Sequence, residues 1–367
     1  MVGNPPYFNL TLNDILKKSR DYPLLSGGIL NASSLFLKRG VDLLMNDGYL
    51  GFIIPKSFLI RNSWKLTREF IFNYSLIMVN DVGKQWEEVG LEQIIIFVTK
   101  NHKQVKTKIY QKFNYINEIP QIFFKESGCI LTGLDDEKLS LVIKIETNTI
   151  RLRDISNMSR GITINSSQYM SKKQDNSIRI LGGTNVERFL IKDGNKRKPN
   201  RFLNSDDPRV KKDIFNQKRI INQRVASSIP KIVATIENEK LPTDDTLNNI
   251  VLTDENFSYE DVLAILNSDL ITFYLRCAII NDSTLTIDLD RPYMGKIPIK
   301  NPKGKFSKII SNILQNKENI MQCSESFDPN ILNQIKHEER KINDMIFELY
   351  GLTEDEGRRI QSIISPN

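Results

Sequence analysis

Apolar positions between residues 34 and 100 switch between helical spacing and short continuous runs. The segment 34–48 stops at an Asp-Gly pair and has its apolar residues at helical spacing, which predicts a helix with Leu35, Phe36, Leu43 and Leu44 on its face. The run YLGFIIP predicts a buried strand, and SWKLTREFIFNY predicts a second amphipathic helix. LIMVNDVG and QIIIFVTK predict two further strands. Because helix and strand alternate, we expect an α/β fold with a doubly wound sheet.

The pattern changes after residue 135. Residues 150–300 contain short β-like runs that are broken by Gly, Asn, Asp and Pro, and helical spacing returns only at 259–280. This pattern predicts a second domain of mixed α+β type. Residues 301–367 are polar and helical, with Ile342, Ile346 and Leu349 on one face. We therefore divide the chain into 1–135, 150–300 and a helical C-terminal segment, 301–367.

The sheet predicted for residues 1–135 is incomplete. Only Met1, Val2 and Gly3 precede the first loop, and three strands with one helix between the first two leave an edge of the sheet open. An open edge of apolar strands promotes aggregation. We therefore expect further sequence upstream that completes the domain, so that the chain is the later part of a longer enzyme.

Positive charge is concentrated in one segment. The chain of 367 residues carries a formal charge of +7, and the segment 188–231 contains thirteen Lys and Arg against four Asp, so this segment alone exceeds the excess of the whole chain. Such a run is either a solvated face or a contact to DNA phosphates. The candidate DNA-binding residues are Lys196, Arg197, Lys198, Arg201, Lys211, Lys212, Lys218, Arg219 and Arg224.

Amide and guanidinium side chains in the same segment are candidates for reading base edges. Asn, Gln and Arg offer the paired donors and acceptors that base edges require. The candidates are Asn216, Gln217, Asn222, Gln223 and Arg224. The alternative for each is an ordinary surface or strand-edge residue.

The sequence shows little sign of disulfide bonds, a metal site, a membrane segment or a nuclease core. The three cysteines are far apart and only two histidines occur, so no disulfide framework or metal site is predicted, and a reducing cytoplasmic location fits. The longest apolar runs have the length of a strand, and no export signal begins the chain, so we expect no membrane partner. A nuclease core is not evident either, because the acidic stretch VNDVGKQWEE falls within the predicted sheet.

The stretch GNPPYF at residues 3–8 combines an amide, two prolines and aromatic rings. The Asn4 amide can accept a hydrogen bond, and the prolines impose an extended backbone whose carbonyl groups stay free. The Pro5 carbonyl would be a second acceptor, and Tyr7 would give a flat face for a planar base. Asn4, Pro5, Pro6 and Tyr7 are therefore candidates for a loop that holds a ring amino group. The alternative is a plain turn or polyproline segment.

The surrounding sequence resembles the gamma-class N6-adenine DNA methyltransferases of restriction-modification systems, including the single-chain type IIG enzymes. GNPPY is similar to the family's catalytic motif, and NASSLFLKRGVDLLMNDGYLGFIIPKSFL to the stretch that follows it. NDVGKQWEEVGLEQIIIFVTK resembles the family's later motif. LRDISNMSRGITI, AILNSDLITFYLR and KIPIKNP resemble the opening and closing parts of its target-recognition domain, and INDMIFELYGLTEDE resembles its tail. This resemblance implies that 1–135 is the later half of a Rossmann-like methyltransferase domain.

The resemblance implies roles for individual residues. Asn4 and the Pro5 carbonyl would hold the N6 amino group of an adenine flipped from duplex DNA, and Tyr7 would stack on it. Trp86 stands where the family often has a second stacking aromatic, and its alternative is a core or rim tryptophan. The methyl donor would be S-adenosylmethionine, bordered by Asn4 and Pro5. Its main binding motifs precede NPPY in the family and are absent from this sequence.

The sequence therefore predicts a site-specific adenine-N6 DNA methyltransferase that lacks its cofactor-binding motifs and is inactive alone. Its expected partners are duplex DNA and an upstream polypeptide that carries the cofactor-binding half. One alternative is a DNA-binding specificity subunit whose NPPY stretch is a relic. Another is methylation of a protein glutamine or of RNA, because NPPY suits planar amino groups in general.

Overall fold

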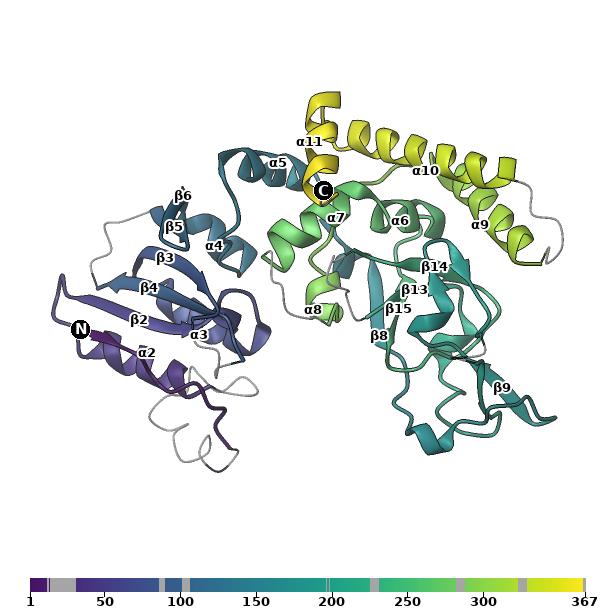
Figure 1. Cartoon of the computed structure of the whole chain (residues 1–367), viewed down its shortest axis with the longest axis horizontal. Helices are drawn as coiled ribbons and strands as arrows, with labels where there is room; N and C mark the ends of the chain where they lie inside the picture. Colours follow the sequence, from purple (N-terminus) through teal and green to yellow (C-terminus); the bar gives the residue numbers. More distant parts are fainter. Residues whose placement is uncertain are drawn as a thin grey trace. The chain divides into compact units, whose positions relative to one another are not determined.

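The chain divides into two compact units in a computed structural model that describes residues 1–11, 13, 31–85, 90–100, 106–195, 197, 199–224, 231–281, 288–322 and 329–365. Unit 1 contains Met1–Ser140 and Cys277–Asp282. Unit 2 contains Leu141–Arg276 and Ser283–Asn367, so it combines the segment 150–276 with the C-terminal helices (Figure 1).

Unit 1 is built on a mixed sheet. In the described part its strands lie in the order β1-β2-β4-β3-β5-β6. Their bounds are β1 Val2–Gly3, β2 Tyr49–Pro55, β3 Ser75–Gly83, β4 Gln93–Thr99, β5 Lys106–Gln111 and β6 Asn114–Pro120. Helices α2 (Ala32–Asp42), α3 (Lys65–Ile71) and α4 (Gln121–Ser127) accompany the sheet. The predicted α/β fold is confirmed, with the predicted strands and helices at nearly their expected residues.

The strand directions are more varied than a doubly wound sheet suggests. β1 is parallel to β2, and β3 is parallel to β5, but β4 lies between β2 and β3 and is antiparallel to both. β4 follows β3 through the short connection 84–92, and a connection of this length permits an antiparallel return but no helical crossover. The carboxyl ends of β1, β2, β3 and β5 therefore meet at the same edge of the sheet.

Helix α2 packs on the sheet through small residues. Its buried face includes Ser33, Ser34 and Gly40, and a Cβ on Gly40 would lie 2.9 Å from Leu50 of β2. The predicted apolar face of this helix is wrong in part, because Phe36 and Leu43 are exposed. The close approach to β2 selects small side chains, and a pattern based on hydrophobicity does not detect them.

Residues 106–127 form two strands and a helix that were not predicted from the sequence pattern. β5 and β6 make a hairpin at one side of the sheet, and α4 follows directly after Pro120. The segment Cys277–Asp282 returns to unit 1, where the buried Asn281 side chain accepts a hydrogen bond from the Thr132 backbone N–H at 2.7 Å. The Asn281 amide also donates to the Thr132 hydroxyl at 3.1 Å.

Unit 2 contains an antiparallel sheet in the order β14-β13-β15-β8. Smaller described pairs join β9 to β12, β10 to β11 and β7 to β16. The bounds are β7 Ile150–Arg151, β8 Ser156–Arg160, β9 Ser177–Ile180, β10 Val186–Glu187, β11 Leu190–Ile191, β12 Arg201–Asn204, β13 Arg219–Gln223, β14 Ala234–Glu237, β15 Leu247–Leu252 and β16 Pro298–Ile299.

In the described chain of unit 2, α5 precedes this sheet and the other α-helices follow it. The α-helices are α5 (Asp136–Glu146, which begins in unit 1), α6 (Tyr259–Leu266), α7 (Asp269–Tyr274), α8 (Arg291–Met294), α9 (Ser307–Gln322), α10 (Pro329–Leu349) and α11 (Glu354–Ile364). The helical stretch predicted at 259–280 is divided, because the Ser268 side chain accepts from the Ile271 N–H and caps a new helix. The predicted helical C-terminal segment is confirmed, with Ile342 and Ile346 buried and Leu349 half-buried.

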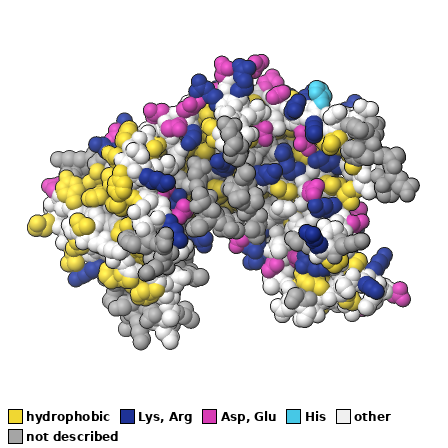
Figure 2. All heavy atoms as spheres, in the orientation of Figure 1, with side chains coloured by type: hydrophobic (Ala, Val, Ile, Leu, Met, Phe, Trp, Pro, Cys, Tyr) yellow, Lys and Arg dark blue, Asp and Glu magenta, His cyan; other side chains and the backbone are white. Residues whose placement is uncertain are grey.

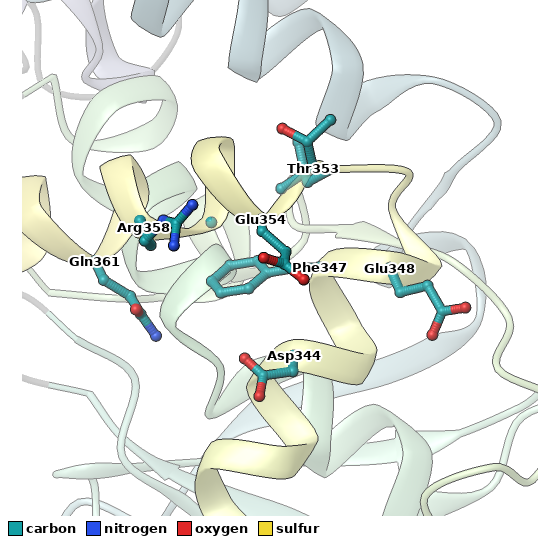
Figure 3. Close-up of a pocket in the computed structure, with 9 residues that line it drawn as sticks. Asp344, Phe347, Glu348, Thr353, Glu354, Arg358 and Gln361 are labelled. Carbon is teal, nitrogen blue, oxygen red and sulfur yellow. The ribbon is translucent and has the colours of Figure 1, made fainter.

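A hollow of about 480 Å³ lies between α10 and α11 (Figure 3). Phe347 packs against Gly357 at its floor, where a Cβ on the glycine would lie 2.9 Å from the ring. Asp344, Glu348 and Glu354 stand around it. None of the residues predicted for catalysis or DNA binding lines this hollow.

No single helix in the described residues is long and apolar enough to cross a membrane. Tyr259–Leu266 and Asp269–Ile279 pass the same length and composition criterion only as a pair, with a bend of 54° between them. Both segments are largely buried in the core of the protein.

Candidate functional site

The NPPY loop leaves the carboxyl end of β1. The strand is held against β2, with Val2 opposite Gly51 and Gly3 opposite Phe52. A side chain at Gly3 would come within 3.0 Å of the Phe52 ring, so this position requires a very small residue. The loop therefore starts at a fixed point at the edge of the sheet where the parallel strands end.

The N-terminus of α2 binds three successive carbonyl groups of the loop. The Ser33 hydroxyl donates to the Pro6 carbonyl at 2.7 Å, and the Asn31 amide donates to the Tyr7 carbonyl at 2.8 Å. The Ala32 N–H donates to the Phe8 carbonyl at 2.9 Å. No described residue donates a hydrogen bond to the Pro5 carbonyl. The helix thus anchors the second half of the loop.

Asn4 and Tyr7 are held together within the loop. The Tyr7 hydroxyl lies 2.7 Å from Asn4 Oδ1 and 3.0 Å from the Ile53 carbonyl of β2. A hydroxyl has one proton and can donate it to only one of these acceptors at a time. If Tyr7 donates to Ile53, the Asn4 oxygen becomes available to a ligand. Asn4 is exposed, Pro5 is buried and Tyr7 is half-buried, so the amide is the accessible part of the site.

Burial raises the pKa of the Tyr7 hydroxyl to about 12. The phenol therefore stays protonated at neutral pH and keeps its donor. We expect a tyrosine titration near pH 12 in the 13C spectrum of tyrosine-labelled protein, and this signal should be missing from Tyr7→Phe. A Tyr7 resonance that titrates at the ordinary tyrosine pKa would contradict the buried hydroxyl that the structure shows.

Asn31 both caps α2 and holds the loop. Its Oδ1 accepts from the Ser33 N–H at 3.1 Å while its amide nitrogen binds the Tyr7 carbonyl. Replacing an Asn N-cap with Ala costs about 1 kcal/mol. We expect Asn31→Ala to lower the free energy of unfolding of unit 1 by about this amount, measured by urea denaturation. Asn9→Ala is the matched control: it removes only the longer hydrogen bond of 3.5 Å from the Asn31 amide to Asn9 Oδ1, keeps the cap and the Tyr7 contact, and should change stability less.

Lys56, Asp81 and Glu92 form a further cluster at the carboxyl ends of β2 and β3. Lys56 Nζ lies 2.8 Å from Asp81 Oδ2 and 3.7 Å from Glu92 Oε2, and all three side chains are largely buried. This cluster ties the end of β2 to both ends of the connection between β3 and β4. Sequence analysis missed it, because the three residues are far apart in the chain and no motif joins them.

Three of the predicted site residues lie outside the part of the chain that the structure describes. Trp86, the predicted second stacking residue, lies outside the described residues, as do Lys196 and Lys198. Gly51 and the pair Gly182-Gly183 are not part of a cofactor-binding turn in unit 1. Gly51 is inside β2 and packs on the Phe97 ring, and Gly182 and Gly183 belong to unit 2.

The predicted role of Arg219 as a DNA contact is wrong. Its side chain is fully buried and pairs with the equally buried Glu237 at 2.5 Å. Its Nε donates to Asn249 Oδ1 at 2.9 Å. Desolvation lowers the pKa of Arg219 and raises the pKa of Glu237. Arg219 therefore stabilises the core of unit 2 and cannot reach a phosphate.

Other basic residues of the segment 188–231 are paired with carboxylates. Arg201 lies 2.6 Å from Asp244 and stacks over the Tyr169 ring. Arg224 lies 2.7 Å from Asp288 and is 12% exposed. Lys218 pairs with Glu260 at 2.7 Å, and Lys211 pairs with Asp206 at 3.2 Å. Most of these carboxylates lie far away in the sequence, so a local charge count overstates the free positive surface.

The exposed candidates for phosphate contact are fewer. Arg197, Lys211 and Lys212 have exposed side chains. Among the proposed base readers, Asn222 is fully buried, and the Gln223 amide donates to the carbonyls of Gly183 and Val186 at 2.8 Å each. Asn216 and Gln217 remain exposed.

A hollow of about 250 Å³ lies between α8 and the strands β8 and β15 in unit 2. Arg160, Arg291 and Asn248 line it beside Met158 and Met294. These residues combine guanidinium and amide groups with an apolar floor, which are the groups that contact base edges and thymine methyl groups. The sequence analysis did not select them, because they lie outside the basic segment.

Two families of known proteins match separate parts of the chain. Residues 1–85 match the Eco57I restriction-modification methylase family. Residues 178–299 match the TaqI-like C-terminal specificity domain. The first match contains the NPPY loop with β1 to β3, and the second contains most of the described strands of unit 2.

Two longer proteins are also similar to this chain. A protein of Methanocaldococcus jannaschii that bears the name of a type II restriction enzyme and methyltransferase is 24% identical over 302 residues, which are 74% of this chain and 25% of that protein. The type IIL restriction-modification enzyme MmeI, solved in complex with DNA, has a TM-score of 0.61 and 11% identity, over 98% of this chain and 57% of that chain. This structural likeness shows a shared fold. The chain thus spans a quarter of the first protein and just over half of the second.

Proposed function

Since this chain combines part of the Eco57I restriction-modification methylase family with a TaqI-like C-terminal specificity domain, we propose that it is the substrate-side and DNA-reading part of an adenine-N6 DNA methyltransferase. The observation that carries this proposal is the NPPY loop at the carboxyl edge of the sheet. Three of its carbonyl groups are bound by the N-terminus of α2, and the Asn4 side chain is exposed and lies 2.7 Å from the Tyr7 hydroxyl.

The loop suits a flipped adenine. The N6 amino group has two hydrogens, and the Asn4 oxygen and the Pro5 carbonyl would each accept one. Hydrogen bonds to both hydrogens free the nitrogen lone pair from the ring and direct it toward a methyl group. The Tyr7 ring supplies a face for stacking, and the bond from its hydroxyl to the Ile53 carbonyl fixes the orientation of this ring.

The described residues fit the methyl donor only in part. S-adenosylmethionine would supply the methyl group, and Asn4 and Pro5 would border it. A glycine-rich turn between a strand and a helix, which would hold the rest of such a cofactor, is not found among the described residues of unit 1.

A surface of unit 1 fits a polypeptide that supplies the cofactor-binding half. In the described sheet β1 is the edge strand, and its neighbour on one side is β2. Val2 is 86% exposed and Met45 is 83% exposed, and Phe36 and Leu43 are exposed as well. Figure 2 shows hydrophobic side chains gathered near the amino end of the chain. A further parallel strand would cover the exposed edge of β1.

Complementation tests the proposal. The purified chain is mixed with a polypeptide that carries a cofactor-binding half of the same family, and transfer of labelled methyl groups to DNA is measured. We expect no transfer by the chain alone and clear transfer by the mixture. Robust turnover by the chain alone would contradict the proposal that another polypeptide supplies the cofactor-binding half. Sequence-specific DNA binding without transfer under any complementation would instead support the specificity-subunit alternative.

A further inference from the structure

The turn between β5 and β6 has an unusual backbone for its residues. Lys112 and Phe113 connect Gln111 to Asn114, and they have φ angles of 46° and 68°. Two-residue hairpin turns with positive φ at both positions strongly favour Asn and Gly. A bulky residue such as Phe in this region is a strained outlier. Such strain often marks a functional position.

The turn is held in this shape by β3 rather than by its own side chains. The Lys112 N–H donates to the Asp81 carbonyl at 2.8 Å, and the Phe113 N–H donates to Asn80 Oδ1 at 3.2 Å. Asn80 and Asp81 are both buried. The Phe113 side chain is 68% exposed, so it contributes little to the core. Folding alone therefore gives no reason for an aromatic residue at this position.

The hairpin carries exposed lysines and aromatic rings, with the half-buried Glu118 opposite Lys108 in the register. Lys108 and Lys112 are exposed, Tyr115 is 58% exposed, and its ring packs edge-on against Tyr110 at 5.6 Å. Within the described residues, neither Lys108 nor Lys112 has an ion-pair partner. Lysines interleaved with exposed aromatic rings are typical of surfaces that bind nucleic-acid backbones and bases.

The hairpin tip lies at the same edge of the sheet as the NPPY loop. β1, β2, β3 and β5 all run in one direction, so the end of β5 and the end of β1 share the carboxyl edge. Four strand spacings separate β1 from β5, which is about 19 Å at the usual distance between strands. A duplex that presents an adenine to Asn4 is wide and long enough to reach the tip.

We propose that the β5–β6 tip is a second DNA contact of unit 1. Lys108 and Lys112 bind phosphates beside the target adenine, and Phe113 packs on a sugar or on the face of an unstacked base. This inference rests on the proposed function, because it requires DNA at the carboxyl edge. The tip is at the opposite side of the sheet from the β1 edge, so it is separate from the surface assigned to the cofactor-binding polypeptide.

Phe113→Asn provides the sharpest test, because stability and binding should change in opposite directions. Asn tolerates the left-handed backbone, so the variant should melt at the same temperature as the unmodified chain or at a higher one. Loss of the ring should weaken binding to a fluorescein-labelled duplex of random sequence by about fivefold or more, measured by anisotropy. If Phe113 had only a structural role, its replacement would not lower the DNA affinity while the melting temperature stayed the same or rose.

Lys112→Gln tests the phosphate contact independently. Each lost phosphate contact lowers the slope of log Kd against log salt concentration by roughly 0.9. Lys125→Gln is the matched control, because Lys125 is an exposed lysine on α4, which begins at the opposite edge of the sheet. We expect a reduced slope for Lys112→Gln and an unchanged slope for Lys125→Gln.

The outcomes separate this inference from the proposed function. If the unmodified chain binds DNA and both hairpin variants bind as it does, the tip is no DNA contact and the inference fails alone. If the unmodified chain does not bind DNA at all, both the inference and the DNA-reading role are overturned. Weaker binding by both variants with intact folding supports the tip contact.

Discussion

Asn4→Ala should reduce methyl transfer by the complemented enzyme at least about a hundredfold in kcat, with a small change in DNA affinity. The N6 nitrogen gains positive charge as it attacks the methyl group, and an acceptor that is already in place stabilises this charge more in the transition state than in the ground state. In the structure the Tyr7 hydroxyl lies 2.7 Å from Asn4 Oδ1 and holds this side chain in place, and the oxygen becomes available to the amino group when Tyr7 donates to the Ile53 carbonyl instead. Single-turnover methylation with excess enzyme measures the effect.

Asn9→Ala is the matched control for Asn4→Ala. Asn9 is an exposed amide in the same loop, and the loop contacts that Pro6, Tyr7 and Phe8 make with α2 do not require its side chain. Its loss should leave kcat nearly unchanged. Equal losses in both variants would mean that the loop acts only as a scaffold, and full activity in Asn4→Ala would remove Asn4 from the chemistry.

Arg219→Ala should lower the free energy of unfolding of unit 2 by about 3–5 kcal/mol, because it leaves a buried carboxylate without its partner. Arg219 and Glu237 are both fully buried and lie 2.5 Å apart. Urea denaturation followed by fluorescence measures the loss. A change typical of an exposed residue, below about 0.5 kcal/mol, would contradict the buried ion pair.

The pH dependence of the same variant gives a second check. Burial already raises the pKa of Glu237, and removal of Arg219 takes away the charge that opposes this effect. A carboxyl group with a raised pKa in the folded state binds protons more readily there than in the unfolded chain, so stability rises as the pH falls. The loss in free energy of unfolding that Arg219→Ala causes should therefore become smaller as the pH falls. The double variant Arg219→Met with Glu237→Leu should recover most of the lost stability, because an apolar pair leaves no unpaired charge.

The sequence predicted the α/β order of unit 1 well, because its strands are continuous apolar runs of ordinary length. β2, β3 and β4 lie where the pattern placed them. It did not predict the antiparallel insertion of β4, because strand direction depends on tertiary pairing. It also missed the face of α2, where the packing requirement is for small residues such as Ser33, Ser34 and Gly40.

The candidate site was predicted in part. The residues of the NPPY loop were selected as one local unit, since a four-residue motif is contiguous in the sequence, and their role in catalysis stays a prediction. Their anchors were not selected, because Asn31 and Ser33 reach the loop only through the folded start of α2. The number of basic residues in the segment 188–231 that are free to contact DNA was overestimated for a similar reason. Partners such as Glu237, Asp244 and Glu260 are distant in sequence but adjacent in the folded unit.

Nucleoside analysis of methylated DNA tests the central claim most directly. The chain, complemented by a cofactor-binding half, is incubated with DNA and methyl-labelled S-adenosylmethionine, and the DNA is digested to nucleosides and separated. We predict that the label appears in N6-methyladenine and that Asn4→Ala abolishes it while Asn9→Ala does not. Label in a cytosine, in the protein or in RNA instead of adenine would contradict an adenine-holding role for the NPPY loop.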